Sequence, residues 1–237
     1  VRAQTACSES GVTLRCGKHK GRLLMPARVQ PPKANNDQEW WPYNYNTAIY
    51  SDDGGKTWQT SAPVQSGTGE GTLAELSDGR IYYNTRIHWD ERPNNTRRRA
   101  AYSDDGGATW KDYRIVEILP DGHQHRSYGC MGGLVRLPVK GRDVLVFSNL
   151  DTARATRERA TVWASFDGGA TWPVKRLVHD GPSGYSSLDA GRPGTPSEGW
   201  IYLLFESAGA KMTRFNLAWI LAGEETGDGS IPDWARP

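Results

Sequence analysis

The sequence predicts an all-β fold of the β-propeller class, because one short motif recurs three times after strand-like segments. The motif is S-x-D-G-G-x-T-W, and its copies span residues 51–58, 103–110 and 165–172. Asp followed by two Gly is typical of a hairpin turn, so each copy predicts a turn whose Trp leads into the next strand. The copies begin 52 and then 62 residues apart, which is the repeat length of units that are each one small antiparallel sheet. The 237 residues then supply about four blades, which form either a closed ring or an incomplete larger one.

Strand-like segments follow one another along the whole chain, and no segment has a clear helical period. An Asp-Gly pair at residues 78–79 separates two of them and predicts a tight hairpin. Three expected strands directly precede the motif copies, at Thr47–Tyr50, Arg99–Tyr102 and Thr161–Ala164. The others are expected at Gly21–Val29, Arg80–Arg86, Gly133–Leu137, Asp143–Ser148, Trp200–Phe205 and Thr213–Trp219.

Composition agrees with short strands and many turns. Only 37% of the residues are hydrophobic, and there are 27 Gly and 14 Pro. Ten Trp and ten Tyr compensate, because aromatic side chains bury a large area per residue between blades. The net charge of +2 creates no strong overall field, so any anion-binding site must be local. No apolar run approaches the ~20 residues of a membrane span, and no leader opens the chain; secreted, periplasmic and lysosomal-like locations all stay open.

Three cysteines are too few for a disulfide scaffold in a chain of this length. Cys7 and Cys16 are close enough in sequence to bridge a short hairpin, but we expect free thiols, with Cys130 buried. Three long connections, at residues 30–42, 87–95 and 182–199, are expected to lie at a rim where binding residues gather. The paired Trp40 and Trp41 in the first of these are interpreted as packing rather than as a sugar platform.

Two further segments carry a family resemblance. Tyr185 lies in Gly-Tyr-Ser-Ser-Leu, and Glu70 lies sixteen residues before Arg86, which ends Asn-Thr-Arg. Together with the three Asp-containing motifs, or Asp boxes, these segments resemble the sialidases (neuraminidases) of the cellular and bacterial type. The resemblance extends from about residue 21 to residue 219. It implies a β-propeller that has six blades in the family, with residues 1–237 as a single domain that represents the later blades.

The resemblance implies an exo-α-sialidase that hydrolyses terminal sialic acids from glycoconjugates with retention of configuration. It places the nucleophile on Tyr185 and its carboxylate partner on Glu70. A phenol with an ordinary pKa of about 10 is a poor nucleophile, so a neighbouring carboxylate must take its proton as it attacks. A neutral nucleophile suits a substrate whose anomeric carbon bears a carboxylate, and sialidases are the known glycosidases that use Tyr.

Guanidinium groups are expected to hold the substrate carboxylate, because they bind carboxylates bidentately and stay charged. Among the three arginines of the family, the resemblance assigns the second to Arg86 and the third to Arg157, with Arg154 and Arg159 as close alternatives. Glu206 resembles the glutamate that orients the first arginine.

The first arginine and the acid/base aspartate of the family have no matching motif here. Arg28 and Asp37 are nearby candidates by residue type alone. The resemblance therefore implies that an N-terminal blade is lacking or that a companion chain supplies it. A non-catalytic sialic-acid lectin and a structural Asp-box propeller are the alternatives to the enzyme.

Several other polar residues are expected to have no role in chemistry. Asp53, Asp105 and Asp167 are interpreted as turn scaffolding, because chemistry rarely needs three identical copies. The run 97–99 is three arginines, which we expect to be a solvated strand edge rather than a nucleic-acid patch. His123 and His125 lack further ligating partners, so neither a metal nor another cofactor is expected. The expected partners are sialylated glycans.

Overall fold

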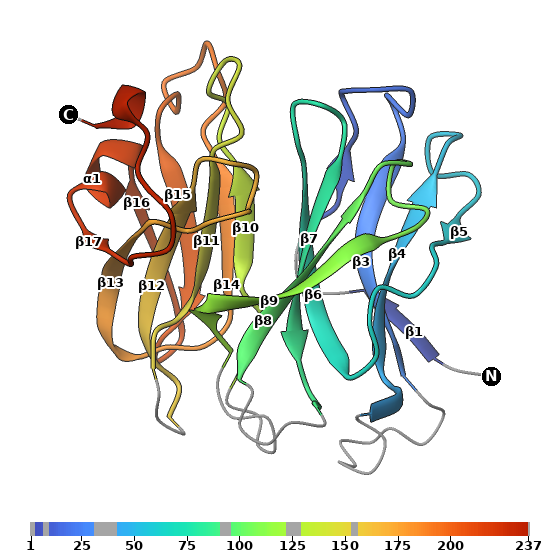
Figure 1. The fold of residues 1–237 in the computed structure, drawn as a ribbon, viewed down its shortest axis with the longest axis horizontal. Helices are drawn as coiled ribbons and strands as arrows, with labels where there is room; N and C mark the ends of the chain where they lie inside the picture. The colour runs from blue at the N-terminus through green and yellow to red at the C-terminus, as the bar shows by residue number, and fades with distance from the viewer. Residues whose placement is uncertain are drawn as a thin grey trace. The chain divides into compact units, whose positions relative to one another are not determined.

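The computed structural model describes residues 3–6, 10–30, 42–90, 96–121, 129–152 and 156–236, and within 3–6 only the backbone. The chain divides into two compact units, Val1–Gly129 and Cys130–Pro237. Two antiparallel sheets make up each unit (Figure 1). Seven residues discussed above lie outside the described residues, namely Cys7, Asp37, Trp40, Trp41, His123, His125 and Arg154.

The first sheet of unit 1 has the strand order β1-β3-β4-β5, with β2 paired to β3. Along its central strand β3, buried positions largely alternate with half-buried ones, as expected of a sheet with one face toward a core. The strands are β1 (Ala3–Ala6), β2 (Val12–Thr13), β3 (Leu23–Gln30), β4 (Tyr45–Ser51) and β5 (Gln59–Thr60).

The second sheet of unit 1 is a four-stranded meander in which each strand pairs with the next along the chain. The expected hairpin at Asp78-Gly79 joins its first two strands, and Gly79 has a φ of 86°, which glycine adopts without strain. The strands are β6 (Thr68–Glu75), β7 (Ile81–Ile87), β8 (Arg97–Ser103) and β9 (Lys111–Pro120).

Unit 2 contains a five-stranded sheet, β10-β11-β12-β13-β17, and a three-stranded sheet, β14-β15-β16. The first comprises β10 (Gly133–Arg136), β11 (Leu145–Leu150), β12 (Glu158–Ser165), β13 (Val174–Pro182) and β17 (Glu224–Glu225). The second comprises β14 (Ser186–Ala190), β15 (Ile201–Glu206) and β16 (Ala210–Phe215).

The strand predicted through Trp219 is wrong beyond Phe215, because the chain turns into the short helix α1 (Leu217–Leu221). Asn216 caps this helix: its side-chain Oδ1 accepts the backbone N–H of Trp219 at 2.8 Å. A 3₁₀ helix follows at Asp233–Ala235. No helix in the described part of the chain is long and apolar enough to cross a membrane.

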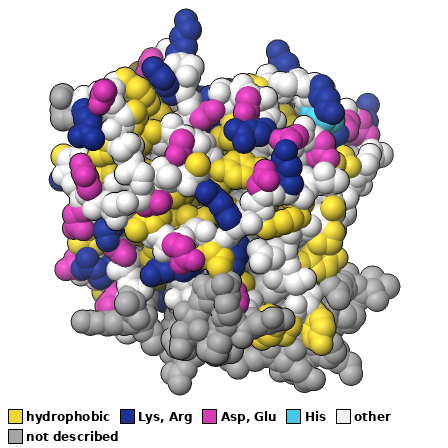
Figure 2. All heavy atoms as spheres, viewed as in Figure 1, with side chains coloured by type: hydrophobic (Ala, Val, Ile, Leu, Met, Phe, Trp, Pro, Cys, Tyr) yellow, Lys and Arg dark blue, Asp and Glu magenta, His cyan; other side chains and the backbone are white. Residues whose placement is uncertain are grey.

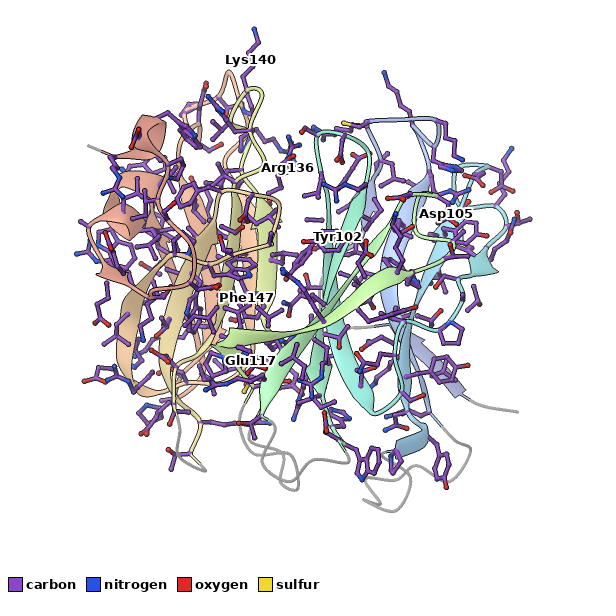
Figure 3. All side chains as sticks on the ribbon, in the orientation of Figure 1. Tyr102, Asp105, Glu117, Arg136, Lys140 and Phe147 are labelled. Atoms are coloured by element: carbon purple, nitrogen blue, oxygen red, sulfur yellow. The ribbon has the colours of Figure 1, made fainter. Side chains whose placement is uncertain are left out.

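All three Asp boxes form the predicted hairpin turns, between β4 and β5, β8 and β9, and β12 and β13. In the second box, labelled at Asp105 in Figure 3, the carboxylate accepts the hydroxyls of Ser103 and Thr109 and the backbone N–H of Thr109. Both glycines of each box have positive φ. The repeated Asp therefore closes a turn, as the sequence indicates.

The core of unit 1 lies between its two sheets and includes Leu24, Leu73 and Trp110. Arg22 also joins the sheets, because its guanidinium binds Asp52 of the first Asp box and donates to backbone carbonyls of the second box. In unit 2, Phe147 on β11, which is labelled in Figure 3, packs in a T-shaped arrangement against Trp172.

The charged side chains on the surface and the state of the described cysteines are both as the sequence predicts. On the face drawn in Figure 2, Lys and Arg side chains are interspersed with Asp and Glu side chains. Cys16 and Cys130 are free thiols, and Cys130 is buried, as expected.

Candidate active site

Glu70 lies in unit 1 at a β-bulge of the β6–β7 hairpin. In the strand register two residues of β6, Gly69 and Glu70, face the single residue Arg86 of β7. The Arg86 Nη1 donates to Glu70 Oε2 at 2.9 Å, and the two residues are only 5% and 7% exposed. The hairpin thus brings together two residues that the sequence separates by sixteen positions, and bulges of this kind often occur beside active sites.

Two further cationic or titratable side chains surround the same carboxylate. Arg28 on β3 has its Nη1 3.5 Å from Glu70 Oε1, and the Nε2 of His88 lies 3.3 Å from Glu70 Oε2. Burial lowers the pKa of the His88 imidazole, against the hydrogen bond with Glu70, and the nearby arginines lower it further. These four residues, Glu70, Arg28, Arg86 and His88, are called the Glu70 cluster. The cluster places two guanidinium groups beside one buried carboxylate.

A second buried ion pair supports the strand that carries Arg86. The Arg98 Nη1 donates to Asp121 Oδ1 at 2.9 Å, and both side chains are fully buried. Arg98 also donates to Asn84 Oδ1, and Asp121 accepts the backbone N–H of Ile87. The pair thus holds the Asn84 side chain through Arg98 and the Ile87 backbone through Asp121, on either side of Arg86 in the sequence.

The arginine run at 97–99 is not a solvated edge, so that prediction is wrong. Arg98 and Arg99 are 0% and 1% exposed, because β8 lies inside its sheet between β7 and β9. Arg99 pairs with Asp90, as Arg98 pairs with Asp121. Sequence reasoning missed these acids because both lie in connections outside the strands, where no local pattern indicates a partner.

Tyr185 lies in unit 2, directly before β14, and is anchored to the end of β15. Its backbone N–H donates to the Glu206 Oε2 at 2.9 Å, and its carbonyl accepts the Glu206 N–H at 3.0 Å. The Arg157 guanidinium lies 5.5 Å from the centroid of the Tyr185 ring, a cation–π distance. A Cβ at Gly184 would lie 2.2 Å from Glu206 Oε2, so only glycine leaves room for this contact.

Each unit therefore groups the residues that the sequence singled out within it. Glu70 and Arg86 are in direct contact in unit 1, and Tyr185 contacts Glu206 and Arg157 in unit 2. Arg159, the described alternative to Arg157, instead donates to Asp180. Glu206, expected to orient an arginine, binds the backbone of Tyr185.

Sequence reasoning missed His88, and it named Arg28 only by residue type. The available signal was Gly69-Glu70-Gly71, because glycines on both sides of a buried acid indicate that other side chains press against its backbone. Within the described residues, no group of three or more His, Cys, Asp or Glu side chains is arranged to hold a metal ion.

Residues 10–195 match the BNR repeat-like domain family. The sialidase of Micromonospora viridifaciens is 32% identical over 240 residues, which cover 99% of this chain and 33% of that protein. The sialidase of Bacteroides fragilis is 34% identical over 173 residues, which cover 70% of this chain and 29% of that protein. The chain therefore spans roughly a third of the length of these curated relatives.

Solved sialidase structures have the same fold. The Hadza microbial sialidase Hz136 superimposes with a TM-score of 0.67 at 27% identity, covering 92% of this chain and 38% of that one. A leech intramolecular trans-sialidase superimposes with a TM-score of 0.68 at 20% identity, covering 92% and 32%, and shows likeness of fold alone. These comparisons confirm the all-β, sialidase-type propeller fold. The chain belongs to the BNR repeat-like family, and sialidases are its homologues over most of its length.

Proposed function

We propose that this chain forms the catalytic propeller, or a large part of it, of a retaining exo-α-sialidase that removes terminal sialic acids from glycoconjugates. The observation that supports this most is that each residue selected by the resemblance contacts another one. Glu70 binds Arg86 in one unit, and Tyr185 lies beside Arg157 in the other. Similarity to a sialidase over 99% of the chain supports the proposed substrate class.

In the proposed first step, the Tyr185 oxygen forms a bond to the anomeric carbon while the bond to the glycosidic oxygen breaks. Glu70 takes the phenol proton, and the leaving oxygen takes a proton from a general acid, which no motif of this chain identifies. In the second step, water attacks the anomeric carbon, gives one proton to the conjugate base of the general acid and displaces the Tyr185 oxygen, to which Glu70 returns its proton. Two displacements give retention of configuration.

Arg86 and Arg157 hold the substrate carboxylate in this proposal. Their guanidinium groups are the donors for the substrate carboxylate, because guanidinium binds carboxylates bidentately. The role of each arginine is thus to bind the acidic sugar in the orientation that presents its anomeric carbon to the phenol.

Hydrolysis of a fluorogenic sialoside tests the proposal. Wild-type protein should release the fluorophore, and Glu70→Gln should lower kcat by roughly 10²–10⁴-fold because the proton acceptor is lost. Tyr185→Phe should abolish turnover, while Tyr202→Phe, on β15 of the same unit, serves as the matched control and should retain it.

Covalent trapping tests the nucleophile directly. A solved Trypanosoma rangeli sialidase structure contains 2,3-difluorosialic acid as a covalent intermediate. The same reagent should add one sugar to this protein by mass spectrometry, and the label should map to Tyr185. If folded protein shows neither turnover nor covalent labelling, the proposed sialidase activity is contradicted.

A sialic-acid lectin is the second candidate, because guanidinium groups can bind a sugar carboxylate whether or not a general acid is present. Retention on immobilised sialic acid without hydrolysis, lost in Arg86→Ala, supports the lectin. If the protein neither binds immobilised sialic acid nor hydrolyses the sialoside, the structural Asp-box propeller is the remaining hypothesis.

A further inference from the structure

We propose that His88 is a positioning residue for Glu70, and that Gly69 exists to admit the His88 ring. The role in catalysis rests on the proposed function, whereas the contact itself does not. His88 lies outside the segment 68–86 that carries the sialidase resemblance, and Gly69 lies within that segment but has no role assigned to it.

The first support is the geometry of the carboxylate. Glu70 Oε2 receives Arg86 Nη1 at 2.9 Å and lies 3.3 Å from His88 Nε2. Arg28 lies 3.5 Å from the other oxygen, Oε1. Each added contact restricts rotation of the carboxylate about its terminal bond. His88 directly follows β7, the strand that carries Arg86, so neighbouring positions in the chain supply both contacts to Oε2.

The second support is Gly69. Its backbone is not in the left-handed region, so conformation alone does not require glycine there. A Cβ at this position would lie 2.2 Å from both Cε1 and Nε2 of His88, which is an impossible contact. The glycine is therefore needed for the space that the imidazole occupies. The ring lies directly against the backbone of the residue before Glu70.

The third support is the charge state of the ring. Among the described residues, the charged groups that act on His88 include Glu70 on β6, Arg86 on β7 and Arg28 on β3. Burial and the two arginines favour neutral imidazole. A neutral ring donates a hydrogen bond through Nε2–H without adding a third positive charge, which would reduce the basicity of Glu70. The ring thus orients the carboxylate and keeps it able to accept a proton.

A double-mutant cycle tests this on turnover of the fluorogenic sialoside. His88→Ala should lower kcat by roughly 10- to 100-fold with little change in KM, because a displaced proton acceptor slows chemistry more than binding. Gly69→Ala should have a similar effect by pushing the ring away. Adding Gly69→Ala to His88→Ala should cost little more, because the colliding ring is gone. His88→Gln should restore most of the activity, because its amide also donates.

His19→Ala is the matched control, because His19 is another part-buried histidine of unit 1 whose pKa burial lowers, and its nearest acids are Asp52 and Asp105. This variant should keep the wild-type kcat. The proposal is overturned if His88→Ala leaves kcat unchanged. It is also overturned if Gly69→Ala lowers kcat by the same factor in the wild-type protein and in the His88→Ala variant.

Nitrogen-15 NMR of the histidine rings gives a readout that needs no turnover. His88 should be the Nε2–H tautomer, and Glu70→Gln and Gly69→Ala should each shift its ring signals while leaving those of His19 unchanged. A His88 ring in the Nδ1–H tautomer, or one insensitive to Glu70→Gln, overturns the contact. If NMR shows the contact between His88 and Glu70 in protein that does not hydrolyse the sialoside, the proposed sialidase activity is contradicted, whereas the positioning of Glu70 by His88 is supported.

Discussion

At the residue scale, the buried ion pair between Arg98 and Asp121 is the support on which the Arg86 strand depends. Burial raises the pKa of the Asp121 carboxyl, and the Arg98 and Arg86 guanidinium groups oppose this effect. A charge buried this completely is tolerated only while its partner is present. The pair therefore links the stability of unit 1 to the position of Arg86.

Asp121→Ala should lower the free energy of unfolding by about 3–5 kcal/mol, because it leaves the Arg98 guanidinium buried without its carboxylate. Urea denaturation measures the change. Lys111 and Asp104 form an ion pair that is about half exposed, so Asp104→Ala is the control, with an expected loss below about 1 kcal/mol. Equal losses in the two variants contradict the prediction.

The two arginines of the Glu70 cluster differ in burial, so they should differ in binding. Arg86 is 5% exposed and in hydrogen-bond contact with Glu70, whereas the Arg28 side chain is 25% exposed at 3.5 Å. Under the proposed function, Arg86→Ala should weaken binding of N-acetylneuraminic acid by at least about tenfold, a loss of about 1.4 kcal/mol, and Arg28→Ala should weaken it less. Calorimetry with both variants measures the order, and the reverse order would argue against a carboxylate site at Arg86.

At the element scale, the Asp-box turn is a self-contained unit of hydrogen bonds. In the first copy the Asp53 carboxylate accepts from Thr57 and Ser51, which lowers its pKa to about 2 although it is exposed. In the second copy burial opposes the same hydrogen bonds, and the pKa of Asp105 is still lowered. A carboxylate used in this way is already saturated with donors, which agrees with scaffolding.

Asp105→Ala should therefore destabilise the fold without changing catalysis. Removing the carboxylate leaves the backbone N–H groups of Ala108 and Thr109 without an acceptor, at an expected cost of about 1–3 kcal/mol. Thermal denaturation and sialoside turnover below the melting temperature separate the two effects. A large fall in kcat with unchanged melting temperature would assign Asp105 to chemistry.

The hairpin β6–β7 shows how an element positions a site. A regular antiparallel ladder sets one residue opposite one, but here Gly69 and Glu70 share Arg86 as their partner. The bulge turns the Glu70 side chain to the same side as the Arg86 guanidinium. Without it the acid and the arginine would not form the same contact.

At the scale of the whole molecule, the part-buried histidines make stability depend on pH. Burial lowers the pKa of both His19 and His88 below 6.5 in the folded state. Their contribution to stability is fully present above pH 6.5, and it is lost as pH falls through the folded pKa, because the unfolded chain then binds protons that the folded chain does not. The pKa of Asp121 is raised, so its contribution to stability has the opposite dependence: it is present at low pH and is lost as pH rises through the folded pKa.

The free energy of unfolding should therefore be smaller at pH 5 than at pH 7.5, and His19→Gln with His88→Gln should reduce this difference. Urea denaturation at both pH values measures it for the wild type and the double variant. The comparison isolates the histidines, because the carboxyl groups are the same in both proteins. An unchanged difference in the double variant contradicts the assignment to these rings.

The sequence alone determined the features that rest on short-range hydrogen bonds. An Asp-box turn is closed by bonds that span two to four residues, so the three turns and the strands beside them follow from local chemistry. The Asp-Gly pair at 78–79 likewise fixes the β6–β7 hairpin. Once that hairpin is known, Glu70 and Arg86 are expected to be neighbours.

Only the tertiary structure decided which side chains of other segments reach that hairpin. Arg28 arrives from another sheet, the His88 ring fits because Gly69 has no side chain, and Arg98 is buried because Asp121 neutralises it. The physical reason is that burial and charge pairing depend on partners distant in sequence, whose positions no local pattern encodes. The same applies to α1, where Asn216 caps a helix on a segment whose composition is typical of a strand.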